Sequence, residues 1–314
     1  MTQSSALPLQ RVGTNGPLVT RIALGCMGLT GTWNPQEFGP SHRARAITAF
    51  EAALEAGINF FDHADIYGGG TCEEVFKDCL QAVPGSRDRI VIATKCGIRP
   101  GFYQLDAPYI AECVERSLKR MGIDYIDLLQ LHRPDPLAHP AETARALNDL
   151  LCRGIVLHVG VSNYYPEQIR ALQRYLDAPL VSNQISISLG RLQSIYEGWD
   201  GGDGTLDQCM ALGLTPLAYS PLARGFLTGK REVPTSDERM SKLVQQLDEV
   251  AHKYAATPTQ VALAWLLRHP AGIVPLVGSA SPAHIREAVG AVSVTLSRED
   301  WYVLWTAAWG RRVP

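Results

Sequence analysis

Long apolar stretches and blocks of like charge are both absent from this sequence. Charged or polar residues interrupt every apolar stretch within about 18 residues, the length that a membrane-spanning helix needs. The 29 Lys and Arg residues nearly balance the 31 Asp and Glu residues, and neither sign forms a long block. This balance argues against a nucleic-acid-binding surface or a basic membrane-binding surface. We therefore expect neither nucleic acid nor a membrane among the partners of this protein.

Targeting signals and metal-binding motifs are also missing. The first residues, MTQSSALPLQR, lack both the basic and the apolar region of a secretory signal. The seven cysteines are odd in number, and no pair of them has the C-x2-C spacing of a zinc site. We expect the cysteines to be small buried hydrophobic residues in a cytoplasmic protein that holds no metal.

The sequence does contain an alternation of short apolar runs with longer segments of helical periodicity. Such alternation predicts parallel strands that are joined by right-handed crossovers. Eight units of this kind close into a (β/α)8 barrel of the TIM type, and we expect residues 1–314 to form one such domain. The eight runs are Arg21–Leu24, Ile58–Phe61, Ile90–Ala93, Tyr125–Leu131, Val156–Val161, Leu180–Ile185, Thr215–Ala218 and Ile273–Leu276.

Additions are expected at both ends of the barrel. Leu7–Val12 and Pro17–Thr20 flank a Thr-Asn-Gly turn, which predicts a β-hairpin covering the amino end of the barrel. Ser297–Ala308 follows the eighth unit and predicts an extra C-terminal helix. A doubly wound dinucleotide fold is the structural alternative, but its G-x-G-x-x-G fingerprint after the first strand is missing. The barrel is the better prediction.

Helix ends are marked by polar residues and glycines. Thr71 followed by Glu74 predicts a capping box, and Thr257 and Ser281 each stand before a proline as expected N-caps. Glycine favours the left-handed conformation of a helix C-cap. Glycines expected at C-termini are Gly57, Gly122, Gly154 and Gly213.

Polar residues follow six successive predicted strands, where the active site of a barrel is built. Each residue alone has a plain structural explanation, such as packing or a buried ion pair. Together they would converge on one mouth, which indicates a site. They are Asp62, Tyr67, Lys95, His132, Ser162, Asn163, Gln184 and Tyr219.

The residue types in this set are suited to one reaction. A tyrosine has a pKa of about 10, and a neighbouring ammonium, oriented by a carboxylate, would make it a better acid. Tyr67, Lys95 and Asp62 supply those parts. The Ser-Asn pair and the glutamine can bind a planar carboxamide, and a tyrosine ring can stack on a heterocycle. The set predicts hydride transfer from a reduced nicotinamide to a carbonyl.

The ordered motifs F-D-x-A-x-x-Y, T-K, H-x-P-D, G-V-S-N, N-Q, Y-S-P-L and V-G-S resemble those of the aldo-keto reductase superfamily. The similarity runs from about Leu9 through Gly310 and is greatest to a bacterial subgroup of oxidoreductases. It implies a catalytic tetrad of Asp62, Tyr67, Lys95 and His132. It also implies that Ser162, Asn163 and Gln184 hold the carboxamide and that Tyr219 stacks on the nicotinamide. The other implied cofactor contacts are Met27 at the ribose and Ser220, Leu222, Arg224 and Gly225 at the pyrophosphate.

The sequence departs from this family at two places. Where relatives that select NADPH carry K-S-x-x-P-x-R, Gly278 replaces the lysine and His284 replaces the arginine. His63 replaces the commoner threonine after the catalytic aspartate; it could shift the acidity of the tyrosine or simply pack. NADP remains the expected cofactor, with NAD as the alternative. Its expected contacts at the 2′-phosphate end are Gly278, Ser279, Ser281, His284 and Arg286.

Three functions are compatible with these residues. The first is an NADPH-dependent reductase of aldehydes or ketones, with a small-molecule carbonyl compound as substrate. The second is an NAD-dependent sugar (aldose) dehydrogenase, and the third is a regulatory subunit that binds the cofactor without turnover. Four aromatic residues are candidates for the wall of the substrate pocket, with ordinary packing as the alternative for each; they are Trp33, Tyr103, Trp199 and Trp309.

Overall fold

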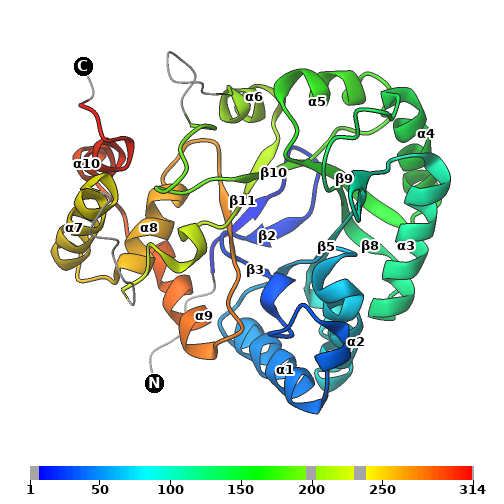
Figure 1. Cartoon of the computed structure of the whole chain (residues 1–314), viewed down its shortest axis with the longest axis horizontal. Helices are drawn as coiled ribbons and strands as arrows, with labels where there is room; N and C mark the ends of the chain where they lie inside the picture. Colours follow the sequence, from blue (N-terminus) through cyan, green and yellow to red (C-terminus); the bar gives the residue numbers. More distant parts are fainter. Residues whose placement is uncertain (1–6, 196–202, 230–237, 313–314) are drawn as a thin grey trace.

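Eight parallel strands form a closed barrel in the computed structural model, which describes residues 7–195, 203–229 and 238–312. All eight strands were expected from the apolar runs, so the predicted (β/α)8 barrel is confirmed (Figure 1). In barrel order they are β3 (Ala23–Gly25), β4 (Phe60–Asp62), β5 (Val91–Cys96), β8 (Ile126–Leu131), β9 (Val156–Ser162), β10 (Ser182–Ser186), β11 (Thr215–Tyr219) and β12 (Val274–Val277).

The expected N-terminal hairpin is present as β1 (Leu9–Arg11) and β2 (Leu18–Thr20). Val12 and Val19 are fully buried in one cluster with residues of the barrel interior, such as Phe60. The backbone N–H of Gly13 donates to the hydroxyl of Thr215, the first residue of β11, at 2.8 Å. The hairpin therefore closes the amino end of the barrel and leaves the carboxyl end for the site.

The helices surround the strands in Figure 1. A second hairpin, β6 (Ile98–Arg99) with β7 (Phe102–Tyr103), follows β5 and was not foreseen from the sequence. The α-helices of the described residues are α1 (Pro40–Glu55), α2 (Thr71–Ala82), α3 (Ala107–Met121), α4 (Pro140–Cys152), α5 (Pro166–Gln173), α6 (Thr205–Leu212), α7 (Glu238–Lys253), α8 (Pro258–Leu267), α9 (Pro282–Val289) and α10 (Arg298–Trp309). None of them is both long and apolar enough to span a membrane.

The predicted extra helix, α10, lies beside α7, and both helices lie outside α8 (Figure 1). Trp265 of α8 and Trp301 of α10 stack at 4.9 Å, and each indole N–H donates to the backbone carbonyl of the other residue. Trp309 stacks on Trp305 of the same helix at 5.7 Å. Trp309 therefore belongs to this outer layer and not to the expected pocket wall, while Trp199 falls outside the described residues.

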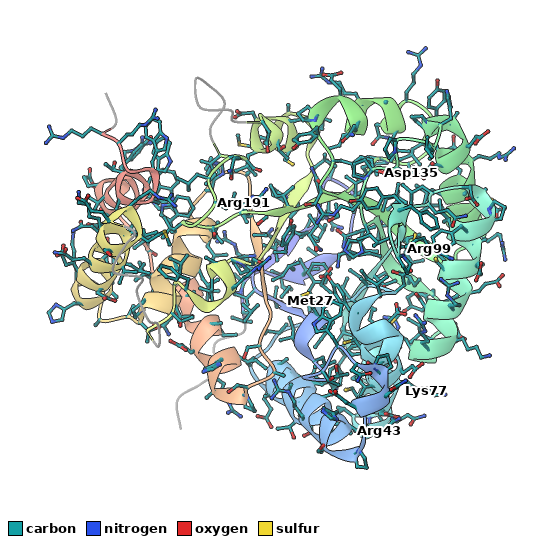
Figure 2. All side chains as sticks on the ribbon, in the orientation of Figure 1. Met27, Arg43, Lys77, Arg99, Asp135 and Arg191 are labelled. Atoms are coloured by element: carbon teal, nitrogen blue, oxygen red, sulfur yellow. The ribbon has the colours of Figure 1, made fainter. Side chains whose placement is uncertain are left out.

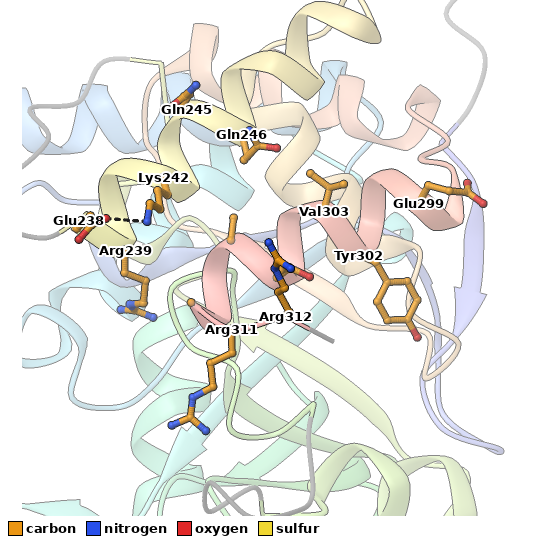
Figure 3. Close-up of a pocket in the computed structure, with 13 residues that line it drawn as sticks. Glu238, Arg239, Lys242, Gln245, Gln246, Glu299, Tyr302, Val303, Arg311 and Arg312 are labelled. Atoms are coloured by element: carbon orange, nitrogen blue, oxygen red, sulfur yellow. Dashed lines mark ion pairs between the residues drawn. The ribbon is translucent and has the colours of Figure 1, made fainter. Parts of the chain in front are cut away.

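A groove of about 1060 Å³ lies between α7 and α10. Figure 3 shows its charged lining, with Glu238 and Lys242 of α7 paired at 2.7 Å. Its lining residues come from α7, from α10 and from the three residues after α10, so it contains none of the predicted site residues. This large groove is therefore separate from the chemistry that the sequence predicts.

Most expected helix ends are confirmed. Thr257 caps α8 through a hydrogen bond from the N–H of Gln260, and Ser281 is the N-cap of α9. The capping box at Thr71 is wrong: Thr71 is the first helical residue, and the N-cap is Gly70 with a φ of 104°. Because glycine has no side chain, Gly70 caps the start of α2 without a side-chain hydrogen bond.

The seven cysteines are free thiols. Six of them are buried, which confirms their expected role as small hydrophobic residues. Cys152 at the end of α4 is the exception, because its side chain is exposed.

Candidate active site

The predicted site residues lie at the carboxyl ends of the barrel strands. Figure 2 labels one residue from the segment that follows each of four barrel strands; they are Met27 after β3, Arg99 of β6 after β5, Asp135 after β8 and Arg191 after β10. Parallel pairing brings the strand ends into register, with Lys95 of β5 beside Gln130 of β8 and Asn183 of β10 beside Val161 of β9. The strand ends therefore meet at one mouth, as the sequence predicted.

Lys95 lies at the centre of the site and is fully buried. Its ammonium donates to Asp62 Oδ2 at 2.7 Å, to the backbone oxygen of His63 at 2.7 Å and to the hydroxyl of Tyr67 at 3.2 Å. An ammonium has three N–H donors, so Asp62, His63 and Tyr67 together satisfy it, with the second oxygen of Asp62 also within reach at 2.9 Å. The three residues meet in the arrangement that the sequence predicted.

Burial and the neighbouring polar groups shift the pKa of Lys95 in opposite directions, and burial and the Lys95 ammonium do the same for Tyr67. Burial disfavours the charged form of Lys95, but the carboxylate of Asp62 and the hydroxyl of Tyr67 more than offset that effect and raise the pKa of the ammonium. Burial also raises the pKa of Tyr67, and the Lys95 ammonium lowers it only in part. The lysine therefore acts in the expected direction, while burial keeps Tyr67 a neutral phenol that can donate a proton.

His132 completes the predicted tetrad. Its ring meets the ring of Tyr67 edge-on, with 6.1 Å between centroids. Burial, followed by the charges of Lys95 and Arg133, lowers the pKa of His132 to about 2. The imidazole is thus neutral at neutral pH, and a neutral imidazole can donate one hydrogen bond and accept another.

Asp62 Oδ1 accepts three hydrogen bonds from three different strands. The donors are Lys95 Nζ at 2.9 Å, Gln184 Nε2 at 2.8 Å and Gln130 Nε2 at 3.2 Å. Gln130, which is fully buried, was not among the predicted site residues. A signal was present, because Gln130 is a polar residue in an apolar strand and lies two positions before His132, on the same face.

A chain of hydrogen bonds links the predicted carboxamide clamp. The hydroxyl of Tyr219 donates to Asn163 Oδ1 at 2.9 Å, and Asn163 Nδ2 donates to Ser162 Oγ at 2.7 Å. Ser162 Oγ donates in turn to the backbone oxygen of Gln184 at 3.0 Å. Asn163 has a φ of 60°, an uncommon conformation that is often found at functional sites. The side-chain amide of Gln184, however, points to Asp62.

The loop after β11 has an unusual backbone. Ser220, Ala223 and Arg224 have φ values of 51°, 49° and 59°, and Gly225 follows with 92°. Backbone turns that combine left- and right-handed residues form concavities in which N–H groups bind anions. Arg224 is exposed there, and Leu222 is half-buried. This backbone fits the pyrophosphate of a dinucleotide.

The predicted 2′-phosphate residues are only partly brought together. Ser279 Oγ lies 3.3 Å from His284 Nδ1 and accepts from the N–H of Ser281 at 3.2 Å. Arg286 turns away and pairs with Glu55 of α1 at 3.1 Å. Around Gly278 there is open space, because an added Cβ would have no neighbour within 4 Å. Together with the clamp and the pyrophosphate loop, these residues fit a nicotinamide dinucleotide.

His63 packs as a buried aromatic ring. It meets the ring of Phe76 edge-on at 4.3 Å, and within the described residues neither ring nitrogen has a hydrogen-bond partner. Burial, with a smaller effect from the Lys95 ammonium, lowers the pKa of His63 to about 3. A neutral His63 ring places no charge near Tyr67, so the structure favours a packing role for His63 over an effect on the acidity of Tyr67.

Two expected wall aromatics lie near the mouth. Trp33, in the loop after β3, meets the ring of Tyr67 edge-on at 6.3 Å between centroids. Tyr103 belongs to the β6–β7 hairpin and is exposed. Met27, expected at the nicotinamide ribose, is also exposed. Of the expected wall aromatics, Trp33 is thus the one whose ring lies against Tyr67.

Comparison with known proteins agrees with this geometry. The model of the aldo/keto reductase family matches residues 21–305. A 6-dehydroglucose reductase of Novosphingobium aromaticivorans is 40% identical over 99% of this chain and all of that protein. Oxidoreductase YdhF of Escherichia coli is 36% identical over 96% of this chain and 98% of its own length. The thermostable aldo-keto reductase Tm1743, solved with the inhibitor epalrestat, superposes with a TM-score of 0.82 at 26% identity, covering 96% of this chain and 100% of that one.

The site and the comparisons lead to the same conclusion. Residues 21–305 contain the barrel, the buried Lys95 with its partners and the clamp around Asn163. Both bacterial relatives extend over nearly the whole chain and agree with the bacterial subgroup that the motifs indicated. This chain belongs to the aldo-keto reductase family and is an NAD(P)H-dependent oxidoreductase.

Proposed function

We propose that this protein reduces aldehydes or ketones to alcohols with NADPH and that Tyr67 is the general acid. The observation that carries this proposal is the 3.2 Å contact between the Tyr67 hydroxyl and the buried ammonium of Lys95. A phenol is a weak acid, and a fixed cation beside it stabilises the phenolate that remains after the proton leaves.

Each residue of the site has a defined task in this mechanism. Ser162, Asn163 and Gln184 would hold the carboxamide, and the ring of Tyr219 would lie against the nicotinamide, which supplies the hydride when bound. Tyr67 gives its proton to the carbonyl oxygen. The neutral imidazole of His132 donates a hydrogen bond to that oxygen, and Asp62 holds the ammonium of Lys95 in place.

The preference for NADPH rests on few contacts. Ser279, Ser281 and His284 are close together at the N-terminus of α9, where backbone N–H groups favour an anion. Arg286 would first have to leave Glu55, an exposed pair that is worth about 0–1 kcal/mol. We therefore propose a preference for NADPH that is weaker than in relatives with two cations at this site.

The names of two relatives point to an oxidised sugar as the substrate. Two of them, from Novosphingobium aromaticivorans and Agrobacterium fabrum, are named 6-dehydroglucose reductase and are 40% and 38% identical to this chain. The alternative activity remains an NAD-dependent sugar dehydrogenase, with the same residues acting in the oxidative direction.

One set of assays separates these functions. Oxidation of NADPH at 340 nm is followed with 4-nitrobenzaldehyde and with 6-dehydroglucose, and reduction of NAD is followed with glucose. We expect turnover of both aldehydes with NADPH and a higher kcat/KM for the sugar. Turnover of glucose with NAD alone would establish the dehydrogenase, and no turnover in any assay, with both cofactors still bound, would establish a regulatory subunit.

A further inference from the structure

Tyr67 is held by a turn that has little rigidity of its own. It starts a short 3-10 helix, η3 (Tyr67–Gly70), between β4 and α2. The three glycines after it have φ values of 58°, 65° and 104°. Glycine has the largest conformational freedom of all residues, so such a turn is costly to fix. Contacts from outside the turn must therefore hold the tyrosine against Lys95.

Arg120 of α3 supplies contacts of this kind from outside the turn. Its Nη1 donates to the backbone oxygen of Asp65 at 2.9 Å and to Glu73 Oε2 at 3.2 Å. The guanidinium also lies against Gly70, because a Cβ at Gly70 would be 2.5 Å from Arg120 Cζ. One arginine thus contacts the turn before Tyr67, the turn after it and the first turn of α2.

Glu73 links this contact to the strand that carries Lys95. Its side chain is fully buried, and Oε1 accepts from the hydroxyl of Thr94 at 2.7 Å. Thr94 immediately precedes Lys95 in β5, and the N–H of Asp65 donates to the backbone oxygen of Lys95 at 3.1 Å. The ion pair therefore connects the two chain segments that bear the phenol and the ammonium.

We propose that the Glu73–Arg120 ion pair positions the hydroxyl of Tyr67 against the ammonium of Lys95. This inference rests on the proposed function, in which Tyr67 is the acid. The pair touches neither the expected carboxamide clamp nor the pyrophosphate loop in the contacts described. Its removal should therefore lower kcat and leave cofactor affinity unchanged, because a small misplacement of a catalytic group can cost about 10²-fold in rate.

A double-mutant cycle tests this role. Arg120→Ala and Arg120→Lys are made in the wild type and in Tyr67→Phe, and kcat, KM and the Kd of NADPH are measured for each. We expect Arg120→Ala to lower kcat roughly 10- to 100-fold in the wild type and less than about 3-fold in Tyr67→Phe. Equal losses in both backgrounds would overturn the positioning role and assign Arg120 to general stability.

Two further variants and a rescue experiment complete this test. Arg120→Ala leaves Glu73 buried without its cation, which destabilises the fold. Glu73→Gln combined with Arg120→Met removes both charges, and we expect it to lose kcat in the same pattern. Added guanidinium should restore part of the kcat of Arg120→Ala. Arg153→Ala is the control, because the exposed Arg153 at the end of α4 pairs with Asp149 of that helix at 3.1 Å. An equal loss of kcat in this control would also overturn the proposal.

The failure of this inference is distinguishable from that of the proposed function. If Tyr67→Phe keeps near-normal turnover, the general acid itself is wrong. If Tyr67→Phe loses turnover while Arg120→Ala keeps it at full stability, the acid is correct and the positioning role is wrong.

Discussion

Gln184 Nε2 donates a hydrogen bond to Asp62 Oδ1 at 2.8 Å, although the two residues are 122 positions apart. The backbone oxygen of Gln184 also accepts from Ser162. Gln184 thus connects the expected cofactor clamp with the carboxylate that holds Lys95. Gln130 donates to the same oxygen of Asp62 at 3.2 Å and offers a comparison within one site.

The two glutamines should differ in their effects. Gln130→Met removes one donor to Asp62, and we expect kcat to fall about 3- to 10-fold, the equivalent of one ordinary hydrogen bond, with the Kd of NADPH unchanged. Gln184→Met should lower kcat and also raise that Kd. Steady-state kinetics and fluorescence titration with NADPH distinguish the two. A raised Kd in Gln130→Met would place Gln130 in the cofactor site instead.

Tyr67→Phe removes the donated proton and keeps the ring. We expect kcat to fall by roughly 10²–10⁴ with cofactor affinity nearly intact. Single-turnover kinetics with NADPH and 4-nitrobenzaldehyde measure the chemical step directly. Retention of near-normal turnover would exclude Tyr67 as the acid.

Lys95→Met should damage both activity and stability. It removes the cation beside Tyr67 and leaves the buried carboxylate of Asp62 without its partner. We expect this loss to lower the free energy of unfolding by about 3–5 kcal/mol. The inflection of the kcat–pH profile that reports Tyr67 should move upward. Asp62→Asn combined with Lys95→Met should recover stability in urea unfolding without recovering kcat. Full activity of Lys95→Met with an unchanged profile would show that the lysine is structural.

Cofactor preference should depend on His284 if its ring meets the 2′-phosphate. His284 Nδ1 lies 3.3 Å from Ser279 Oγ at the start of α9, and an imidazole N–H can donate a hydrogen bond to a phosphate oxygen. We expect His284→Ala to raise the Kd of NADPH about 3- to 10-fold, the equivalent of one ordinary hydrogen bond, and to leave the Kd of NADH unchanged. An unchanged Kd of NADPH in His284→Ala would remove His284 from the phosphate site.

The contribution of Asp65 to the stability of the fold should decrease as pH rises. Burial, followed by the nearby charge of Glu73, raises the pKa of Asp65 from 3.8 to about 6. A raised folded-state pKa means that the native state binds its proton more tightly, so the contribution of Asp65 to stability is present below pH 4 and is lost between about pH 4 and 6. The difference corresponds to about 2–3 kcal/mol.

Asp65→Asn provides the comparison for this prediction. Urea unfolding of both proteins between pH 4 and 7 should show the stability of Asp65→Asn rising relative to the wild type across that window. A constant difference over the whole range would show that Asp65 keeps an ordinary pKa.

The sequence alone determined the barrel and the identity of the main site residues. Its eight apolar runs could be placed because strands buried on both faces are continuously apolar, and polar residues such as Lys95 and His132 stood out at their ends. These are local signals, each contained in a few neighbouring residues. The N-terminal hairpin and the Thr257 cap were predicted for the same reason.

Only the tertiary structure decided how side chains from distant segments pair. The amide of Gln184 could have faced the clamp but reaches Asp62, and Arg286 pairs with Glu55 of α1. Arg120 reaches Asp65 and Glu73 across 55 and 47 positions. Such pairings depend on which helix faces pack together and on how far each long side chain extends, and no local pattern of residues contains that information.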